Sequence, residues 1–284
     1  MLTQLSFCQE EKMFHPNQIC PGVFHIADEM GVCFTLIEGS DRAVLFDTGY
    51  GTENVSDYVG TLTSKPVSVI LSHGHHDHML GARWFEKTYL CREDLDEFHE
   101  RTGVFQRTKV SRQAHERGVQ LPDDFMEAAI PVPEAIRFTD TIAGFESLTE
   151  DLGGMEIQVI HVPGHTPGSA VIHVPAYDLL LTGDDWNPCT WMWFPTSMNA
   201  DGWRDNMRML INALEQVSGS GIGRVLCSHQ PMLRTGEELK SFLAYMTDER
   251  LKAAPPVDMG APIDTHQIVK DEWTLVFDQS KINT

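Results

Sequence analysis

The apolar residues of this chain fall into short runs that are separated by turns rich in Gly, Asp and Glu. Runs of about four to eight residues with many Val, Ile and Leu are typical of buried β-strands. Three early runs predict an antiparallel meander over Gly22–Ile26, Val32–Ile37 and Ala43–Phe46. Further strands are expected at Val67–Ser72, Met155–Ile160, Ala170–Val174, Asp178–Leu181 and Arg224–Cys227.

Between these runs, apolar residues recur at helical spacing. This spacing predicts helices at Glu53–Thr63, Met79–Phe85, Trp203–Val217 and Glu237–Lys252. Residues 1–18 have no clear period and are expected to form an N-terminal arm. Residues 19–254 then form the main domain, and residues 255–284 form a C-terminal extension. In that extension, Trp273–Phe277 is expected to be an edge strand or an oligomer contact.

The stretch from about residue 92 to residue 134 is rich in helix formers and charge, and we interpret it as a helical insertion. Its middle part carries five basic residues against one acidic residue, Glu116. These basic residues could form a cationic lid over a site. Alternatively they form a solvated helix face that balances neighbouring carboxylates, which is the interpretation that we favour. The five are Arg101, Arg107, Lys109, Arg112 and Arg117.

The composition is that of a globular protein, because 284 residues of which 42% are hydrophobic can form a sizeable core. No apolar run approaches the ~20 residues that span a bilayer, and Met1 to Cys20 lacks the pattern of an export signal. The six cysteines have no CxxC spacing, which favours free thiols in a reducing cytoplasm. The net charge of -20 disfavours nucleic acid. We therefore expect a cytoplasmic protein with a small-molecule substrate and no membrane partner.

Candidate chemistry is concentrated in the segment His73–His78, which follows a predicted strand. His73 and His75 are two residues apart on a nearly extended backbone, so their side chains point to the same side. Asp77 and His78 are adjacent and must point differently. The segment therefore predicts two metals side by side, each with its own ligands.

This segment resembles the HxHxDH signature of the metallo-β-lactamase superfamily, and the likeness extends from about residue 19 to about residue 233. The Asp-Thr-Gly of that family is present as residues 47–49. The resemblance implies an α/β (α+β) fold, a four-layer αββα sandwich with the ligands along one edge of the paired sheets. The further ligands that it implies each follow a strand-like run, and they are His165, Asp184 and His229.

The resemblance also implies how the ligands are shared. It assigns His73, His75 and His165 to one divalent metal, Asp77, His78 and His229 to a second, and Asp184 to both. Asp77 and Asp184 are the carboxylates expected to act in catalysis. Asp47 is implied to hold a ligand histidine by a hydrogen bond. Zinc is the expected metal, although iron and manganese suit the same donors.

The charge of such a centre predicts its chemistry. Two divalent cations, two carboxylates and one hydroxide leave a net positive charge, which lowers the pKa of a metal-bound water to about 7. A metal-bridging hydroxide is then available at neutral pH without a Ser or Cys nucleophile. The expected reaction is hydrolysis. His76 and Asp185 neighbour the ligands and are interpreted as spacers.

An aromatic segment follows Asp184 and is predicted to form a pocket wall beside the metals. Large aromatic side chains at such a place exclude water and bind an acyl chain or a ring. The expected substrate is accordingly a small ester, lactone or thioester. The alternative is that these side chains cover the hydrophobic core. They are Trp186, Trp191, Trp193 and Phe194.

Other activities use similar ligand sets. A mononuclear iron sulfur dioxygenase keeps similar residues, so the ligands alone do not exclude an oxidoreductase. A phosphodiesterase and a non-catalytic metal-binding protein are further alternatives. A protein of the last kind should have lost a ligand, and none is missing here. The sequence leaves the oligomeric state open, with a homodimer as one option.

Overall fold

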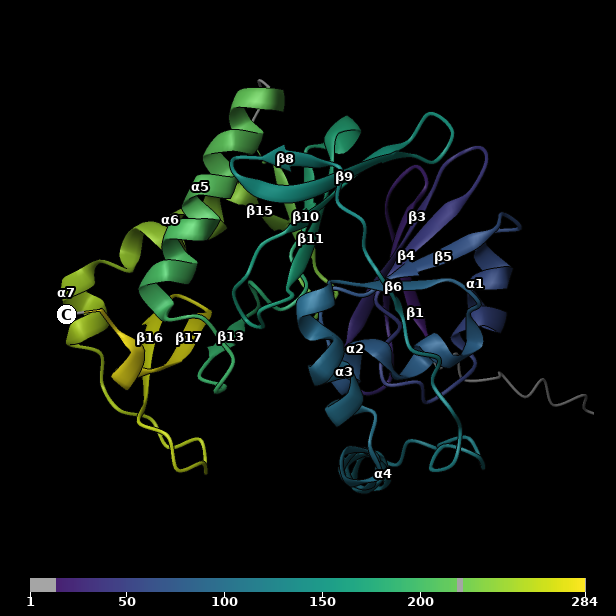
Figure 1. The fold of residues 1–284 in the computed structure, drawn as a ribbon, viewed down its shortest axis with the longest axis horizontal. Helices are drawn as coiled ribbons and strands as arrows, with labels where there is room; N and C mark the ends of the chain where they lie inside the picture. Colours follow the sequence, from purple (N-terminus) through teal and green to yellow (C-terminus); the bar gives the residue numbers. More distant parts are fainter. Residues whose placement is uncertain (1–13, 219–221, 284) are drawn as a thin grey trace, which may run out of the picture.

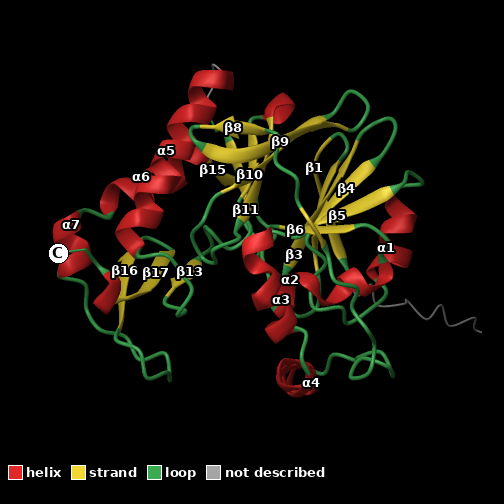
Figure 2. Ribbon diagram, viewed as in Figure 1, coloured by secondary structure: helices red, strands yellow, loops and turns green. Residues whose placement is uncertain are grey.

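Two seven-stranded sheets lie against each other in the computed structural model, which describes residues 14–218 and 222–283. Helices cover the outer face of each sheet, and Figures 1 and 2 show the resulting four layers. This arrangement confirms the predicted αββα sandwich. A third sheet of three strands, which the sequence did not predict, lies beside the helices of the second half.

The first sheet has the strand order β1 to β7. Its first four strands form an antiparallel meander, of which the sequence predicted the last three, and its last four strands run parallel to one another. β1 includes residues 15–18, which the sequence assigned to the N-terminal arm; residues 1–13 lie outside the described part. The strands are β1 (His15–Cys20), β2 (Val23–Ala27), β3 (Cys33–Glu38), β4 (Ala43–Phe46), β5 (Val67–Ile70), β6 (Thr88–Leu90) and β7 (Glu134–Ala135).

The second sheet has the order β15-β14-β12-β11-β10-β9-β8. β8 to β12 are antiparallel neighbours, and β12 pairs with β14 in parallel. Its strands are β8 (Asp140–Ile142), β9 (Phe145–Asp151), β10 (Glu156–His161), β11 (Ala170–Val174), β12 (Leu179–Leu181), β14 (Arg224–Leu226) and β15 (Arg234–Thr235).

The helices differ from the predictions in two places. Met79–Phe85 is mostly a 3-10 turn over Leu80–Trp84. The helix expected over Glu237–Lys252 is two helices, because the Thr247 side chain caps a new helix by accepting a hydrogen bond from the Arg250 N–H. The helices are α1 (Val55–Leu62), α2 (His76–Met79), α3 (Leu95–Arg101), α4 (Val104–Arg117), α5 (Ala200–Ser218), α6 (Gly236–Tyr245) and α7 (Asp248–Lys252).

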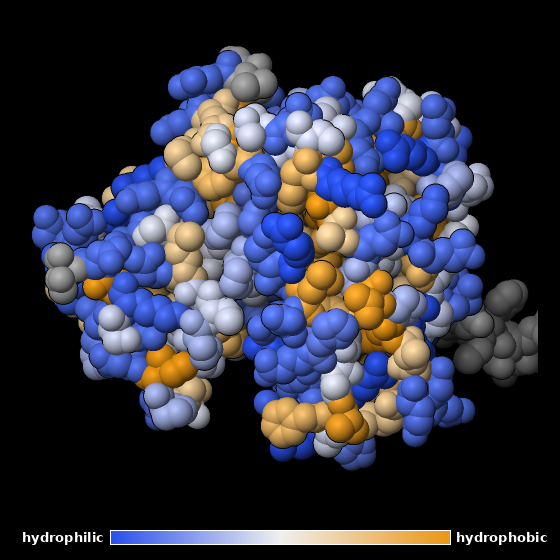
Figure 3. All heavy atoms as spheres, viewed as in Figure 1, coloured by the Kyte–Doolittle hydropathy of each residue, from blue (hydrophilic) through white to orange (hydrophobic). Residues whose placement is uncertain are grey.

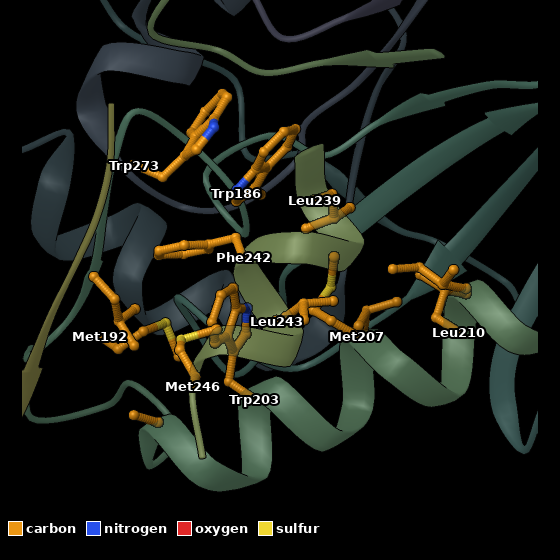
Figure 4. Close-up of a cluster of buried hydrophobic side chains, with 14 of the residues drawn as sticks. Trp186, Met192, Trp203, Met207, Leu210, Leu239, Phe242, Leu243, Met246 and Trp273 are labelled. Atoms are coloured by element: carbon orange, nitrogen blue, oxygen red, sulfur yellow. The ribbon is translucent and has the colours of Figure 1, made fainter. Parts of the chain in front are cut away.

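Three of the four apolar clusters among the described residues hold the layers together. The middle cluster joins the facing sides of the two sheets, for example Val44 of β4 and Ile172 of β11. A second cluster lies between the first sheet and α1, α3 and the 3-10 turn. The third packs α5, α6 and α7 against the second sheet, and Figure 4 shows Trp203 of α5 beside Leu243 and Met246 in this cluster. The apolar face of each predicted helix is thus the face that it buries.

The C-terminal extension belongs to the third sheet. β17 (Trp273–Asp278) lies between β13 (Cys189–Met192), with which it is parallel, and β16 (Thr265–Lys270), with which it is antiparallel. The strand expected at Trp273–Phe277 is therefore present, but it lies in the middle of its sheet and not at an edge. Three of its residues have apolar side chains that enter the third cluster, so this strand is central and buried.

No helix among the described residues combines the length and the apolar character that a membrane span needs.

A buried histidine predicts how the stability of this fold changes with pH. His173 of β11 is 1% exposed, and burial lowers its pKa to about 4. The unfolded chain binds this proton below its ordinary pKa of 6.5, so stability is complete above pH 6.5 and decreases as the pH falls toward 4. Between pH 7.5 and pH 5 we expect His173 to reduce the free energy of unfolding by about 2 kcal/mol.

The measurement is chemical denaturation of chelator-treated protein at both pH values. His173→Gln keeps a polar partner for Gln158, whose Oε1 lies 3.0 Å from His173 Nδ1. The variant should lose less stability than the wild type on acidification. An identical loss in both proteins would show that His173 is not a source of the pH dependence.

Candidate metal centre

The candidate ligands meet because each follows the carboxyl end of a strand. His73 comes after β5, and His165, Asp184 and His229 come after β10, β12 and β14, which all run in the same direction. The edges of the two sheets are joined at this end by a hydrogen bond from Ala170 N–H to the Ser72 carbonyl, 2.8 Å long. Ligands from both sheets therefore converge at one edge.

The first ligand group consists of His73, His75 and His165, which are all buried. The His75 Nδ1 atom lies 2.9 Å from His165 Nε2. The ring centroid of His73 lies 4.6 Å from the ring centroid of His75 and 4.8 Å from that of His165. The three imidazoles thus surround one point, as the sequence predicts.

The second group consists of Asp77, His78, Asp184 and His229. Asp184 Oδ2 lies 3.2 Å from His229 Nε2 and 3.6 Å from His165 Nε2. Its other oxygen, Oδ1, lies 3.4 Å from His78 Nε2. Asp77 Oδ2 is 3.6 Å from both His78 Nε2 and His229 Nε2. Asp184 is therefore in reach of both groups.

The hydrogen bonds of the histidines test whether these residues fit a metal. In three of them Nδ1 donates outward, from His78 to Asp47, from His165 to the Trp191 carbonyl, and from His73 to Ser72 Oγ. Their Nε2 atoms therefore carry lone pairs. Those of His73 and His78 are buried without any hydrogen-bond partner in the described part of the chain. A buried lone pair without a partner is costly unless a ligand occupies it.

His75 gives the strongest observation of this kind. Its Nε2 atom lies 3.2 Å from a Glu97 carboxylate oxygen, has no hydrogen-bond partner among the described residues, and its Nδ1 atom lies 2.9 Å from His165 Nε2. A proton on Nε2, toward Glu97, would leave lone pairs on both facing nitrogens, and a cation beside them would stabilise that arrangement. The donor set therefore fits a metal.

The pKa shifts of the first ligand group agree with this interpretation. Burial and the neighbouring imidazoles lower the pKa of His165 to about 4 and hold that of His73 well below its usual range, so both rings are neutral, as metal ligands must be. At His78 burial also disfavours the charge, but Asp184, Asp77 and Asp47 raise its pKa. The second group thus contains buried negative charge that a divalent cation can balance.

Asp47 has the role that the family resemblance implied. Its carboxylate accepts hydrogen bonds from His78 Nδ1 at 2.9 Å, from Ser72 N–H at 2.7 Å and from Ser72 Oγ at 2.8 Å. Its backbone has a φ of 66°, which is uncommon for a residue with a side chain. Asp47 therefore orients His78 directly and His73 through Ser72.

A pocket of about 460 Å³ opens beside the ligands. Trp191 and Phe194 line it, as predicted, and the Phe194 ring lies edge-on to His75 with centroids 5.0 Å apart. Trp193 stacks on Phe194 but is not among the residues that line the pocket. The prediction of Trp186 as a substrate contact was wrong, because its ring is completely buried and stacks on Trp273 at 4.0 Å (Figure 4).

Comparison with known proteins decides the family. The model of the metallo-β-lactamase superfamily matches residues 28–229, which is most of the chain. The chain belongs to the metallo-β-lactamase superfamily. Among solved structures, a metallo-β-lactamase from Erythrobacter litoralis is 15% identical with a TM-score of 0.54, and the match covers 82% of this chain and 96% of that one. This likeness shows the shared fold.

Two relatives are similar to this chain over about half of its length. An uncharacterized protein of Mycobacterium tuberculosis is 31% identical over 167 residues, which are 54% of this chain and 66% of that protein. The human acyl-coenzyme A thioesterase MBLAC2 is 24% identical over 173 residues, 54% of this chain and 60% of that enzyme. The chain thus matches less than two thirds of the length of these relatives.

Asp94 is a site residue that the sequence analysis missed. It is fully buried in the insertion, and its carboxylate accepts hydrogen bonds from Gly74 N–H at 2.8 Å, Gly168 N–H at 2.6 Å and Thr166 Oγ1 at 2.7 Å. Gly74 lies between two ligands, and a Cβ there would be 2.9 Å from the Asp94 carbonyl oxygen. Asp94 therefore joins the His73–His78 segment to the loop that carries His165.

Two neighbours of the ligands do more than the sequence analysis assigned to them. Asp185, interpreted as a spacer, is buried, and its Oδ1 accepts the backbone N–H of His165 at 2.8 Å. Its contact orients the first ligand group. His76 lines the pocket and lies edge-on to Tyr50, with ring centroids 5.8 Å apart.

The insertion is helical only in part. α3 and α4 cover residues 95–117, and the structure has no helix between residue 119 and β7. Arg107 donates to two backbone carbonyls, and Arg112 lies 3.9 Å from Glu116. α4 also presents Val104 and Phe105, which are 69% and 70% exposed. Figure 3 shows apolar patches among the hydrophilic surface of this face of the molecule. The cationic lid, which was the alternative to the favoured solvated helix face, is therefore not formed by these side chains. Of the five basic residues, Arg101 lines the pocket.

Proposed function

We propose that this chain binds two divalent cations, most simply zinc, and hydrolyses a small ester, lactone or thioester. The observation that carries the proposal is the convergence of two ligand groups at one point, with His75 Nδ1 2.9 Å from His165 Nε2 and Asp184 within reach of both groups. Divalent cations at such a centre lower the pKa of bound water and polarise a carbonyl oxygen. The chain's own side chains must then orient the substrate and exclude water.

The pocket supports a substrate with an apolar part. Trp191 and Phe194 form one wall beside His165, and Pro188 continues it. Burial of an acyl chain or ring against these side chains removes apolar surface from water and holds the carbonyl near the ligands. Tyr50 also lines the pocket, and burial raises the pKa of its phenol, so the hydroxyl remains protonated and can donate a hydrogen bond. The thioester within the proposed class has additional support from the likeness to MBLAC2.

The test is metal analysis of the purified protein followed by a substrate panel. We expect about two metal equivalents per chain and turnover of at least one ester, lactone or thioester that a chelator abolishes and zinc restores. Trp191→Ala should lower kcat/KM about tenfold for substrates with long apolar groups and less for acetyl substrates. Phe105→Ala, which removes an exposed aromatic ring outside the pocket, is the matched control.

The same panel separates the alternatives. Oxygen uptake with a persulfide substrate, together with one bound iron per chain, would show that the protein is an oxidoreductase and not a hydrolase. Turnover of phosphodiesters alone would change the substrate class. Tight metal binding without any turnover would indicate a metal-binding protein. Equal effects of Trp191→Ala on every substrate would remove the apolar wall from the proposal.

A further inference from the structure

Arg101 has a place in the pocket that metal binding does not explain. It ends α3, and it is the one Lys or Arg among the described residues that line the pocket beside the ligands. Its side chain is 20% exposed. In a protein with a net charge of -20, a half-buried cation that faces a substrate cavity is an exception to the overall charge. It therefore requires an explanation of its own.

The guanidinium is only partly satisfied by the protein. Its Nε–H donates to Glu97 Oε1 at 2.7 Å. Neither terminal nitrogen donates a hydrogen bond to any residue in the described part of the chain, and Glu97 is the one carboxylate there within 4 Å of the group. The end of the guanidinium with its two terminal nitrogens thus keeps the paired N–H groups that bind a carboxylate or phosphate through two parallel hydrogen bonds.

The surroundings of Arg101 strengthen such an interaction. Its guanidinium lies over the Phe194 ring, 5.7 Å from the centroid, and the same ring is edge-on to His75 and His165. An aromatic ring on one side holds the guanidinium in place and reduces its contact with water. Hydrogen bonds to a charged group are stronger where water is excluded.

The position of Arg101 near the metal ligands limits how far apart the anionic group and the reacting carbonyl of the substrate can be. Arg101 Nε is joined to Glu97, and the same Glu97 oxygen lies 3.2 Å from His75 Nε2. The guanidinium is therefore two short contacts from the first ligand group. Arg101 also lines the same pocket as His75, Asp184 and His229, so one small substrate can contact Arg101 and reach both ligand groups.

We propose that Arg101 binds an anionic group of the substrate, a carboxylate or a phosphate, a few bonds from the scissile carbonyl. The substrate class is thereby narrowed to acidic esters or thioesters. This inference rests on the proposed hydrolase function. The anion can belong to the acyl group, as in a thioester of a dicarboxylic acid, or to the leaving group, as in a phosphorylated thiol, and the experiment distinguishes these two sources.

The experiment compares paired substrates on the zinc-loaded protein. Succinyl and butyryl thioesters of pantetheine test a carboxylate on the acyl group, and butyryl thioesters of pantetheine and 4'-phosphopantetheine test a phosphate on the leaving group. We expect Arg101→Met to lower kcat/KM about 10- to 100-fold for one of the charged substrates and by less than about threefold for its neutral partner. Arg101→Lys should retain part of the preference, because it keeps the charge without the fork.

Arg112→Met is the matched control, since it removes an exposed arginine of α4 outside the pocket. It should change no substrate ratio. If Arg101 instead serves only to hold Glu97 against His75, Arg101→Met will lower kcat/KM equally for charged and neutral substrates and will reduce zinc affinity. That result would overturn the proposal.

A binding measurement keeps the inference separate from the hydrolase proposal. Calorimetry of the zinc-loaded protein compares glutarate with butyrate, which present the same carboxylate to the metals and differ in a second one. We expect tighter binding of glutarate in the wild type and equal binding in Arg101→Met. If no thioester is turned over but this difference is observed, the hydrolase proposal fails and the anion site stands. Equal binding of both acids by the wild type and no charged-substrate preference would refute the anion site.

Discussion

Asp184→Asn is expected to lower kcat/KM by about 10³-fold, because this carboxylate serves both ligand groups. Its oxygens lie 3.2 Å from His229 Nε2 and 3.4 Å from His78 Nε2. Although burial alone would raise it, the pKa of Asp184 is held well below its usual range by His229 and His78, so the group is a carboxylate at neutral pH. An amide removes that charge and several kcal/mol of electrostatic stabilisation.

Metal analysis and kinetics of Asp184→Asn should therefore change together. We expect fewer metal equivalents than in the wild type, with an unchanged circular dichroism spectrum, because the amide keeps the shape of the side chain. Asp140→Asn, at an exposed position of β8, controls for the loss of one negative charge. Wild-type metal content with wild-type turnover would show that Asp184 does not belong to the centre.

Asp94→Ala is expected to reduce both stability and metal affinity. The substitution leaves the N–H groups of Gly74 and Gly168 and the Thr166 hydroxyl without their acceptor inside the protein. Each buried donor that loses its partner costs about 1 to 3 kcal/mol. We expect a loss of about 4 kcal/mol in the free energy of unfolding and a 10- to 100-fold weaker affinity for zinc.

Denaturation of the metal-free protein and zinc titration measure these two effects separately. Asp94→Asn keeps the shape and one acceptor oxygen, so it should fall between the wild type and Asp94→Ala. Asp96→Ala, two residues away on the exposed face of α3, should behave as the wild type. A loss of stability with unchanged zinc affinity would limit Asp94 to a role in folding.

The sequence predicted the fold well where local pattern and global fold agree. The strands around the ligands have an unbroken apolar character because they are buried between two layers, and the observed β4 coincides with the predicted run Ala43–Phe46. β9 and β13 were missed. β9 has only two apolar residues, Phe145 and Leu148, and so lacks an apolar run. β13 depends on pairing with a strand more than 80 residues later in the chain.

The ligand residues were predictable because their spacing is local or because each follows a strand. Asp94, Glu97 and Arg101 were not, since nothing in a charged helical segment indicates which of its side chains faces the site. Only the packing of the insertion against the His73–His78 segment decides this. Trp186 was misassigned for the same reason, because its partner Trp273 comes from the far end of the chain.

The pairing of β13 with β17 joins a strand beside the pocket to a strand near the end of the chain. β13 carries Trp191, and its neighbour β17 is anchored by Trp273 beneath Trp186. The shape of the pocket that we propose as the substrate site is therefore set partly by the last thirty or so residues of the chain. Selection or engineering at these C-terminal positions offers a route to new substrate preferences while the catalytic ligands stay untouched.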